Sequence, residues 1–154
     1  MKILVYSDSH GYKNKVVAML ERESDSDFCF FLGDGMREAE EAAAVYPKIK
    51  FILVKGNNDF YSDREKIAYK HIDGLTFVAC HGDDVNVRYG LYDLIEKARS
   101  VRGHIALYGH THLRNTYNDI SSGVFALNPG AMCEGQYAVI TTDKGKFDIE
   151  KKLI

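Results

Sequence analysis

The sequence predicts an α/β domain in which two β-sheets pack together and helices cover their outer faces. Five short apolar runs are rich in β-branched and aromatic residues, helical segments separate several of these runs, and two hairpin signals follow later in the chain. Apolar residues at consecutive positions are typical of strands that are buried on both faces. Alternating strands and helices followed by hairpins indicate mixed sheets rather than one purely parallel sheet.

The five apolar runs are the strands that we expect at the centre of the sheets. Two of them contain Cys29 and Cys80, which we expect to be buried as free thiols, whereas Cys133 lies in a stretch of loop composition. Three cysteines without C-x-x-C spacing do not support a disulfide framework or a zinc or redox site. The runs are Ile3–Tyr6, Phe28–Leu32, Phe51–Val54, Leu75–Cys80 and Ile105–Tyr108.

Two helices are expected between the first three strands. Val16, Val17 and Leu20 give the first helix one apolar face. Residues 36–45 are rich in Ala and Glu, which are strong helix formers, and Pro47 ends this helix-prone run.

Later in the chain the sequence predicts one more helix and two hairpins. The helix has apolar residues at i, i+3, i+4 and i+7, which are Leu91, Leu94, Ile95 and Ala98, and it is expected to stop at Gly103. The first hairpin is indicated by Asp73-Gly74, a turn signature between the runs Ile67–Ile72 and Leu75–Cys80. The second hairpin joins Tyr137–Thr142 to Phe147–Leu153 through Asp143-Lys144-Gly145-Lys146.

Length and composition indicate one soluble domain that spans residues 1–154. The chain is 45% hydrophobic and 27% charged, which is ordinary for a protein with a packed core. Twenty Lys and Arg against 22 Asp and Glu give a formal net charge of −2, so no basic surface for nucleic acid is indicated. No apolar run approaches the ~20 residues of a membrane helix, and the short apolar start is unlike a signal peptide. We therefore expect a cytoplasmic protein that does not bind membranes, and the sequence leaves its oligomeric state open.

The functional signal lies in the residues that follow the apolar runs. Each of the five runs is followed by Asp, Asn or His with a glycine beside it. Ligands bind outside the carboxyl ends of the strands in α/β sheets, so we expect these side chains to converge on one site. The segments are Ser7-Asp8-Ser9-His10-Gly11, Gly33-Asp34-Gly35, Lys55-Gly56-Asn57-Asn58-Asp59, His81-Gly82-Asp83-Asp84 and Gly109-His110-Thr111-His112.

We select seven side chains in these segments as candidate ligands, because carboxylates, imidazoles and amides are the groups that bind first-row divalent ions. Seven ligands are too many for one tetrahedral ion and suit two ions that share a carboxylate. His71 and His104 lie outside the pattern, and we expect both to be structural or surface residues. The candidate ligands are Asp8, His10, Asp34, Asn57, His81, His110 and His112.

Taken singly, several of these segments also have ordinary structural interpretations. Asp8 could cap the first helix, and Gly33-Asp34-Gly35 is common as a turn. Gly56-Asn57-Asn58-Asp59 has the composition of an unremarkable loop. The order of all five segments, each at the end of a strand, is what favours a two-metal site.

In this order, the motifs Asp-x-His, Gly-Asp, Gly-Asn-x-Asp, His-Gly and Gly-His-x-His resemble those of the calcineurin-like metallophosphoesterase superfamily. The short chain and the segment Asn128-Pro129-Gly130-Ala131 are similar to its small, single-domain YfcE-like phosphodiesterase branch. The resemblance spans the whole chain. It implies a four-layer α-β-β-α sandwich of two mixed sheets with flanking helices, and a site at the strand ends.

The resemblance also implies how the ligands divide between two ions, with Asp34 as the bridging carboxylate. One ion would be held by Asp8, His10, Asp34 and His112. The other ion would be held by Asp34, Asn57, His81 and His110.

At position 58 the sequence departs from the superfamily pattern. Many members have a His there, which is taken to protonate the leaving group or to bind phosphate, whereas this chain has Asn58. An amide cannot act as a general acid, although it can donate a hydrogen bond to a phosphate oxygen. Asn58 and Asp59 are our candidate catalytic residues, and Asp59, Asn128 and Thr111 are candidates to support the ligands from behind.

A second departure follows the fourth strand run. The branch often has His-Gly-His where this chain has His81-Gly82-Asp83, which removes a second imidazole contact. Arg88 and Tyr89 lie further along the same loop and could contact substrate, but a solvated loop is the simpler interpretation.

These residues predict a metal-dependent phosphoesterase that acts on a small phosphoester, and they favour a phosphodiesterase within that class. The expected cofactors are two divalent ions, with Mn²⁺ as the first choice and Ni²⁺, Fe²⁺ or Zn²⁺ as alternatives. A hydroxide that bridges two ions ~3.5–4 Å apart could attack phosphorus in line. Lack of a His acid at position 58 costs about 10²–10⁴-fold, so we expect modest rates and a preference for good leaving groups.

Two other functions stay open at this point. The same site could serve a phosphomonoesterase or a phosphoprotein phosphatase. The chain could instead be a metal-binding interaction scaffold with little turnover, as is the retromer subunit of similar architecture. That subunit has a degraded site, whereas every implied metal position is filled here.

Overall fold

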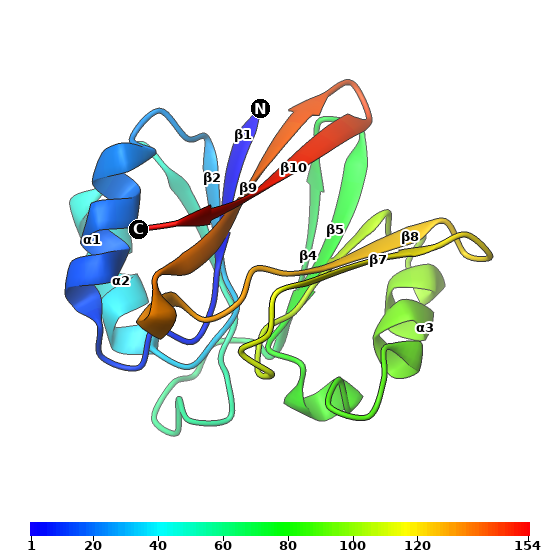
Figure 1. Ribbon diagram of the computed structural model, residues 1–154, viewed down its shortest axis with the longest axis horizontal. Coiled ribbons are helices and arrows are strands. Elements are labelled where there is room, and N and C mark those ends of the chain that lie inside the picture. The colour runs from blue at the N-terminus through cyan, green and yellow to red at the C-terminus, as the bar shows by residue number, and fades with distance from the viewer.

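The computed structural model describes all of residues 1–154, and its centre is a pair of five-stranded sheets packed face to face (Figure 1). Both sheets are mixed. Across the first sheet the order is β10 (Lys146–Leu153), β9 (Gln136–Asp143), β1 (Lys2–Tyr6), β2 (Phe28–Phe31) and β3 (Lys50–Leu53). Across the second sheet the order is β4 (Ile67–Ile72), β5 (Leu75–Cys80), β6 (Ile105–Leu107), β8 (Val124–Asn128) and β7 (Asn115–Asp119).

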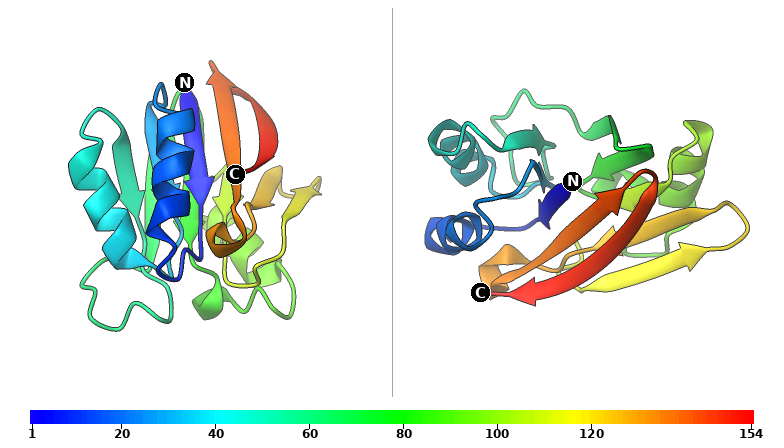
Figure 2. Two further views of the ribbon diagram at one scale, coloured as in Figure 1. Left: turned by 60° about the vertical axis from the view of Figure 1, so that its left-hand side comes forward. Right: turned by 90° about the horizontal axis from the view of Figure 1, so that it is seen from above.

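Helices cover the outer face of each sheet. The helices α1 (Lys13–Arg22) and α2 (Met36–Val45) lie on the first sheet, and α3 (Tyr92–Ser100) lies on the second (Figure 2). The four layers therefore follow one another as α-β-β-α, which confirms the predicted fold class. None of these helices is long and apolar enough to cross a membrane.

The strand residues alternate between two apolar layers. Ile3 and Val5 of β1 pack between the sheets, whereas Leu4 and Tyr6 pack under α1 and α2, and all four are fully buried. This alternation explains why the strand reads as a continuous apolar run rather than as a polar–apolar repeat. Cys29 and Cys80 are buried as free thiols, as expected.

Strand direction brings several loops to one end of the sandwich. β1, β2 and β3 are parallel in the first sheet, and β5, β6 and β8 are parallel in the second. The loops that follow these strands lie together at the lower edge of Figure 1. Two short 3₁₀ turns, η1 (Asp83–Val85) and η2 (Met132–Glu134), belong to these loops.

The predicted hairpins are confirmed, and one further hairpin was missed. Asp73 and Gly74 both have positive φ (51° and 83°), as do Lys144 and Gly145 (47° and 84°), which is the backbone of a tight hairpin turn. The missed hairpin joins β7 to β8. Four of the five residues of β7 are exposed at the edge of the sheet, so the strand has no apolar run that would reveal it.

Candidate metal centre

Five loops carry the predicted ligands, and backbone hydrogen bonds tie these loops together. The Asp8 N–H donates to Gly33 O at 2.9 Å, and the Gly109 N–H donates to His81 O at 2.8 Å. His81 Nδ1 lies 2.7 Å from Leu32 O, so this contact joins the loop after β5 in the second sheet to the end of β2 in the first sheet. Because a carbonyl oxygen only accepts, the proton of a neutral His81 is on Nδ1, and its Nε2 lone pair faces the site.

A first cluster of ligand atoms joins Asp8, His10 and His112. Asp8 Oδ1 lies 3.2 Å from His112 Nε2 and 3.7 Å from His10 Nε2. The two ring nitrogens of His10 and His112 are 3.3 Å apart. These three side chains come from the loops after β1 and β6 and could hold one ion.

A second cluster joins Asp8, Asp34 and His81, all of which are buried. His81 Nε2 lies 3.4 Å from Asp34 Oδ2 and 4.0 Å from Asp8 Oδ1. His110 adjoins this cluster, with its Nδ1 3.2 Å from His81 Nε2. Asp34 Oδ2 is also 4.0 Å from His10 Nε2, so both carboxylates lie between the two sets of imidazoles.

Asn57 is the one amide among the predicted ligands, and its place in the metal centre stays a prediction. It is exposed, and its side chain forms no hydrogen bond. Its neighbour Asn58 instead contacts Asp34 twice, through the backbone N–H to Oδ1 at 2.8 Å and through Nδ2 to Oδ2 at 2.6 Å. The amide at position 58 therefore holds the carboxylate that the family pattern implies as the bridge.

Asp34 remains ionised in this cluster. Burial would raise the pKa of Asp34, but contacts with His81 and Asn58 hold that pKa well below its usual range. Burial would lower the pKa of His81, but Asp34 and Asp8 raise it. Burial and the charges of His81 and Arg88 lower the pKa of His110. No Lys or Arg side chain pairs with either buried carboxylate, so a bound cation would add to the positive charge that the imidazoles can supply.

The side chains fit divalent ions. Asp8 Oδ1 is buried and accepts no hydrogen bond, although three imidazole nitrogens surround it at 3.2–4.0 Å. Leaving a buried carboxylate oxygen without a partner is costly. A mixed set of carboxylate oxygens and imidazole nitrogens is the ligand chemistry of first-row divalent metals.

The backbone is strained where these ligands lie. A positive φ is uncommon for any residue with a side chain, and such strain gathers at functional sites. Five of the nine non-glycine residues with positive φ are predicted ligands. They are Asp8 (55°), His10 (43°), Asp34 (62°), His110 (66°) and His112 (59°).

Two glycines allow the loops to approach closely. A Cβ at Gly56 would lie 2.2 Å from Asp34 Oδ1, and a Cβ at Gly109 would lie 1.9 Å from Ser7 Oγ. Neither glycine has a positive φ, so the lack of a side chain, rather than backbone freedom, is what the site needs at both positions. At these two positions the glycine beside a predicted ligand thus has a packing reason.

Asp59 clamps the loop that carries Asp34. Its Oδ2 accepts from the backbone N–H groups of Asp34 and Gly56, both at 2.8 Å. Its Oδ1 accepts from Gly35 and Met36, both at 2.9 Å. These bonds occupy the four lone-pair positions of the carboxylate and satisfy the amides at the start of α2. The geometry fits a positioning residue rather than a group that contacts substrate.

Asn128 supports the loop after β6 in a similar way. It is fully buried, and its Nδ2 donates to Gly109 O at 2.9 Å and to Thr111 Oγ1 at 3.0 Å. Its Oδ1 accepts from the Gly130 N–H at 2.9 Å. Asn128 therefore fixes the segment between His110 and His112 from behind.

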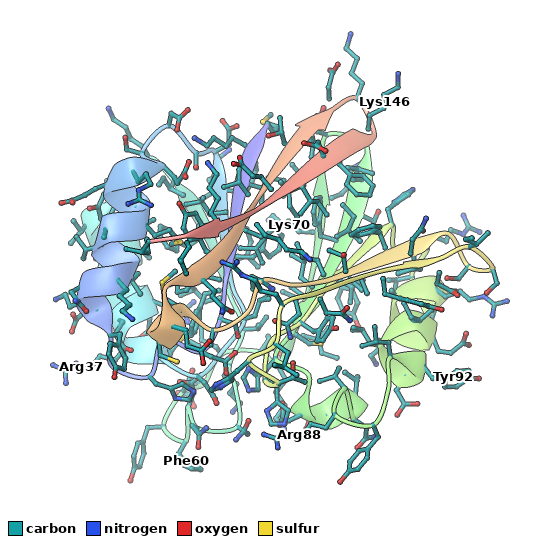
Figure 3. All side chains as sticks on the ribbon, in the orientation of Figure 1. Arg37, Phe60, Lys70, Arg88, Tyr92 and Lys146 are labelled. Carbon is teal, nitrogen blue, oxygen red and sulfur yellow. The ribbon has the colours of Figure 1, made fainter.

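The loop after β5 brings Arg88 to the edge of the cluster. Arg88 Nε donates to His110 Nε2 at 2.9 Å, so this exposed side chain belongs to the site (Figure 3). Tyr89 beside it is 92% exposed. His71 and His104 lie away from the cluster, where both contact Thr76 near the β4–β5 hairpin, as expected for structural residues.

Comparison with known proteins adds a family match and several similar structures. The family model of the calcineurin-like phosphoesterase superfamily domain matches residues 1–145. A conserved protein of Streptococcus pneumoniae, described as a predicted phosphoesterase, is 25% identical with a TM-score of 0.83, and the match covers 99% of this chain and 88% of that one.

Two solved structures at lower identity share the fold alone. Vps29 of Entamoeba histolytica, in complex with Zn²⁺, is 17% identical with a TM-score of 0.79, over 99% of each chain. An archaeal phosphodiesterase is 20% identical with a TM-score of 0.72, over 99% of this chain and all of the other.

Proposed function

The chain belongs to the calcineurin-like phosphoesterase superfamily, and from its site we propose that it is a phosphodiesterase that uses two divalent metal ions. The observation that carries this proposal is the unpartnered, buried Asp8 Oδ1 among three imidazole nitrogens. A bound cation would give this oxygen the partner that no hydrogen bond within the chain provides.

The two ligand clusters support two ion positions in this proposal. Asp8, His10 and His112 would hold one ion, and Asp34 and His81, with His110 beside them, would hold the other. We propose Mn²⁺ as the first choice and Ni²⁺, Fe²⁺ or Zn²⁺ as alternatives, because a mixed nitrogen and oxygen set discriminates weakly among them. Bound ions would supply a nucleophilic water at neutral pH and draw charge from the phosphoryl oxygens.

The protein's own groups would orient the phosphate. The Asn58 amide keeps Asp34 in place and has a second N–H that can donate to a phosphoryl oxygen. Arg88, at the opposite edge of the cluster, presents a guanidinium that can pair with the anion. In the hydrolysis, a bond forms between water oxygen and phosphorus, the bond from phosphorus to the ester oxygen breaks, and the alcohol leaves with a proton.

Position 58 holds no group that can protonate a leaving alkoxide, so the site suits esters of either kind whose alcohols leave readily. One feature favours a diester over a monoester. A cavity of about 740 Å³ adjoins Asn58 and offers room for a second ester substituent, which a monoester lacks. The likeness in fold to an archaeal phosphodiesterase agrees with this choice.

The test is hydrolysis of bis(4-nitrophenyl) phosphate beside 4-nitrophenyl phosphate, with Mn²⁺ present and with Asp34→Asn as the control variant. We expect the diester to be cleaved faster, and we expect cleavage to be lost in Asp34→Asn. Cleavage of the monoester alone would favour a phosphomonoesterase. Tight metal binding without cleavage of either ester, with each of the four metals, would contradict the proposal and favour an interaction scaffold, a role open to this fold.

A further inference from the structure

A cavity of about 740 Å³ lies beside the metal centre, between the first half of α2 and residues 58–64. Asn58 belongs both to its wall and to the metal centre, because the same side chain donates to Asp34 Oδ2 at 2.6 Å. An ester group of a phosphate bound at the metal centre would therefore extend past Asn58 into this cavity. The volume is within the ~300–1,000 Å³ that is typical of small-molecule sites.

Two large aromatic side chains stand at this cavity without covering partners. Phe60 is 79% exposed and Tyr61 is fully exposed, and both line the cavity. Figure 3 shows Phe60 and Arg88 at the same end of the molecule. Exposing two neighbouring aromatic side chains to water is unfavourable, and such apolar patches are typical of ligand-binding surfaces. A planar aromatic group of a ligand can stack on such side chains whatever its pattern of hydrogen bonds.

Charges around the cavity decide between ligand classes. Its two arginines are already paired, Arg37 with Glu41 and Arg64 with Glu40, each with a nitrogen–oxygen distance of 3.1 Å. No unpaired cation is left in the wall to hold a second phosphate. The two glutamates are paired with these arginines and Asp59 accepts from four backbone N–H groups, so the exposed Asp63 is the one wall carboxylate that forms neither an ion pair nor a hydrogen bond. An uncharged aromatic group fits best.

We propose that this cavity is a subsite for an uncharged, planar aromatic ester group of the substrate, such as a nucleoside. This inference rests on the proposed function, since it places the phosphate at the metal centre. Phe60 and Tyr61 are the specificity-determining residues, and they contact the ester group that stays on phosphorus.

The experiment compares three diesters that share 4-nitrophenol as the leaving group, with the Mn²⁺-loaded protein. The retained groups are thymidine, methyl and choline. Stacking on one aromatic side chain contributes about tenfold, so we expect kcat/KM for the thymidine ester to exceed that for the methyl ester by about that factor or more. Phe60→Ala and Tyr61→Ala should each lower this ratio toward one.

Tyr92→Ala is the matched control, because Tyr92 is 76% exposed on α3 and lies far from Phe60 (Figure 3). This variant should keep the wild-type ratio. A ratio near one in the wild type, or a ratio that does not change in either cavity variant, would overturn the inference. A preference for the choline ester would overturn it in favour of a cation site.

A binding measurement separates this inference from the proposed function. Calorimetry should show that thymidine 5′-monophosphate binds about tenfold more tightly than methyl phosphate, and that Phe60→Ala removes the difference. If no diester is cleaved, the proposed function fails, and the binding ratio still decides whether the subsite exists. If diesters are cleaved but the two monophosphates bind equally, the subsite alone is refuted.

Discussion

Arg88 Nε lies 2.9 Å from His110 Nε2, and this hydrogen bond determines which ring nitrogen of His110 carries the proton. Guanidinium only donates, so His110 Nε2 must accept, and the proton of a neutral His110 is on Nδ1. That Nδ1 is 3.2 Å from His81 Nε2, whose own Nδ1 donates to Leu32 O. The groups thus form one directed chain of donors from Arg88 to the first sheet.

A metal ion at His110 is incompatible with the Arg88 hydrogen bond. An ion on Nε2 would take the lone pair that Arg88 uses, and an ion on Nδ1 would move the ring proton to Nε2. Arg88→Ala should therefore tighten metal binding, by about tenfold, since hydrogen bonds to charged groups contribute ~1.5–3 kcal/mol. Loss of a nearby positive charge acts in the same direction.

Competition for Mn²⁺ with a chromophoric chelator measures this affinity without any turnover. Arg99→Ala is a suitable control, because Arg99 is exposed on α3 and pairs only with Glu96. Unchanged or weaker metal binding in Arg88→Ala would show that the arginine and the ion do not compete.

Asn58→His should give the site the acid that it lacks. A positioned general acid contributes about 10²–10⁴-fold, and the gain is largest for alcohols that leave poorly. We expect methyl phenyl phosphate to gain roughly 10²-fold and methyl 4-nitrophenyl phosphate to gain much less. The rate should also fall above the usual imidazole pKa of about 6.5, because the acid must be protonated.

Initial rates for the two esters from pH 5 to pH 9 test this variant. Asn58→Ala is the control, because it removes the amide without adding an acid and should gain on neither ester. Equal gains for both esters, with no new limb in the pH profile, would mean that the histidine acts on binding instead.

Asp59→Ala should destabilise the loop that carries Asp34. The substitution leaves four backbone N–H groups without their acceptor, among them those at the start of α2. We expect a loss of roughly 2–4 kcal/mol in the free energy of unfolding, together with weaker metal binding. Urea denaturation of the metal-free protein measures the first effect. Asp63→Ala, at an exposed position of the same loop, should lie within about 0.5 kcal/mol of the wild type.

The central strands and most of the metal cluster could be predicted from the sequence. Strands that are buried on both faces have apolar residues at consecutive positions, and the predicted metal ligands follow directly after these strands in the sequence. Asp8, Asp34 and His81 were therefore expected together, and the structure places them together. The β7–β8 hairpin was missed because an exposed edge strand such as β7 requires no apolar residues.

Other features of the site depend on contacts that sequence spacing does not reveal. A left-handed backbone is expected at glycine, so nothing in the sequence marks the positive φ of Asp8 or His112. The role of Asp59 was obscured because it caps a helix 24 residues earlier in the chain, whereas most caps lie next to the helix they serve. The contact between Asn58 and Asp34 was hidden as well, because a motif gives residue types and not the directions of side chains.

Glu23 supports a prediction about stability at acid pH. It follows α1, and its buried carboxylate accepts from Tyr137 Oη at 2.9 Å and lies 2.9 Å from Lys2 Nζ and 3.0 Å from Lys152 Nζ. Three strands, β1, β9 and β10, are thereby tied to one helix. Burial alone would raise the pKa of Glu23, but the contacts with Lys2, Lys152 and Tyr137 outweigh it and lower this pKa from 4.5 to about 2.

A carboxylate whose pKa is lower in the folded state favours folding once it is ionised. Between about pH 2 and pH 4.5 the unfolded chain binds more protons at Glu23 than the folded chain does, so stability rises with pH in that window. The contribution is complete above pH 4.5 and is lost as the pH falls through about 2. Each pKa unit corresponds to ~1.4 kcal/mol, so lowering the pKa from 4.5 to about 2 corresponds to about 3.5 kcal/mol. Solvent screening at the partly exposed lysines reduces this contribution to about 2–3 kcal/mol at neutral pH.

Glu23→Gln removes this charge and keeps the size of the side chain. We expect the variant to be about 2–3 kcal/mol less stable than the wild type at pH 7, and we expect the difference to shrink toward zero near pH 2. Urea denaturation at several pH values measures it, with Glu21→Gln, at an exposed position of the same helix, as the control. A difference that stays constant across the pH range would show that the cluster acts through hydrogen bonding and packing, because only a titrating charge makes the stability of the two proteins converge in acid.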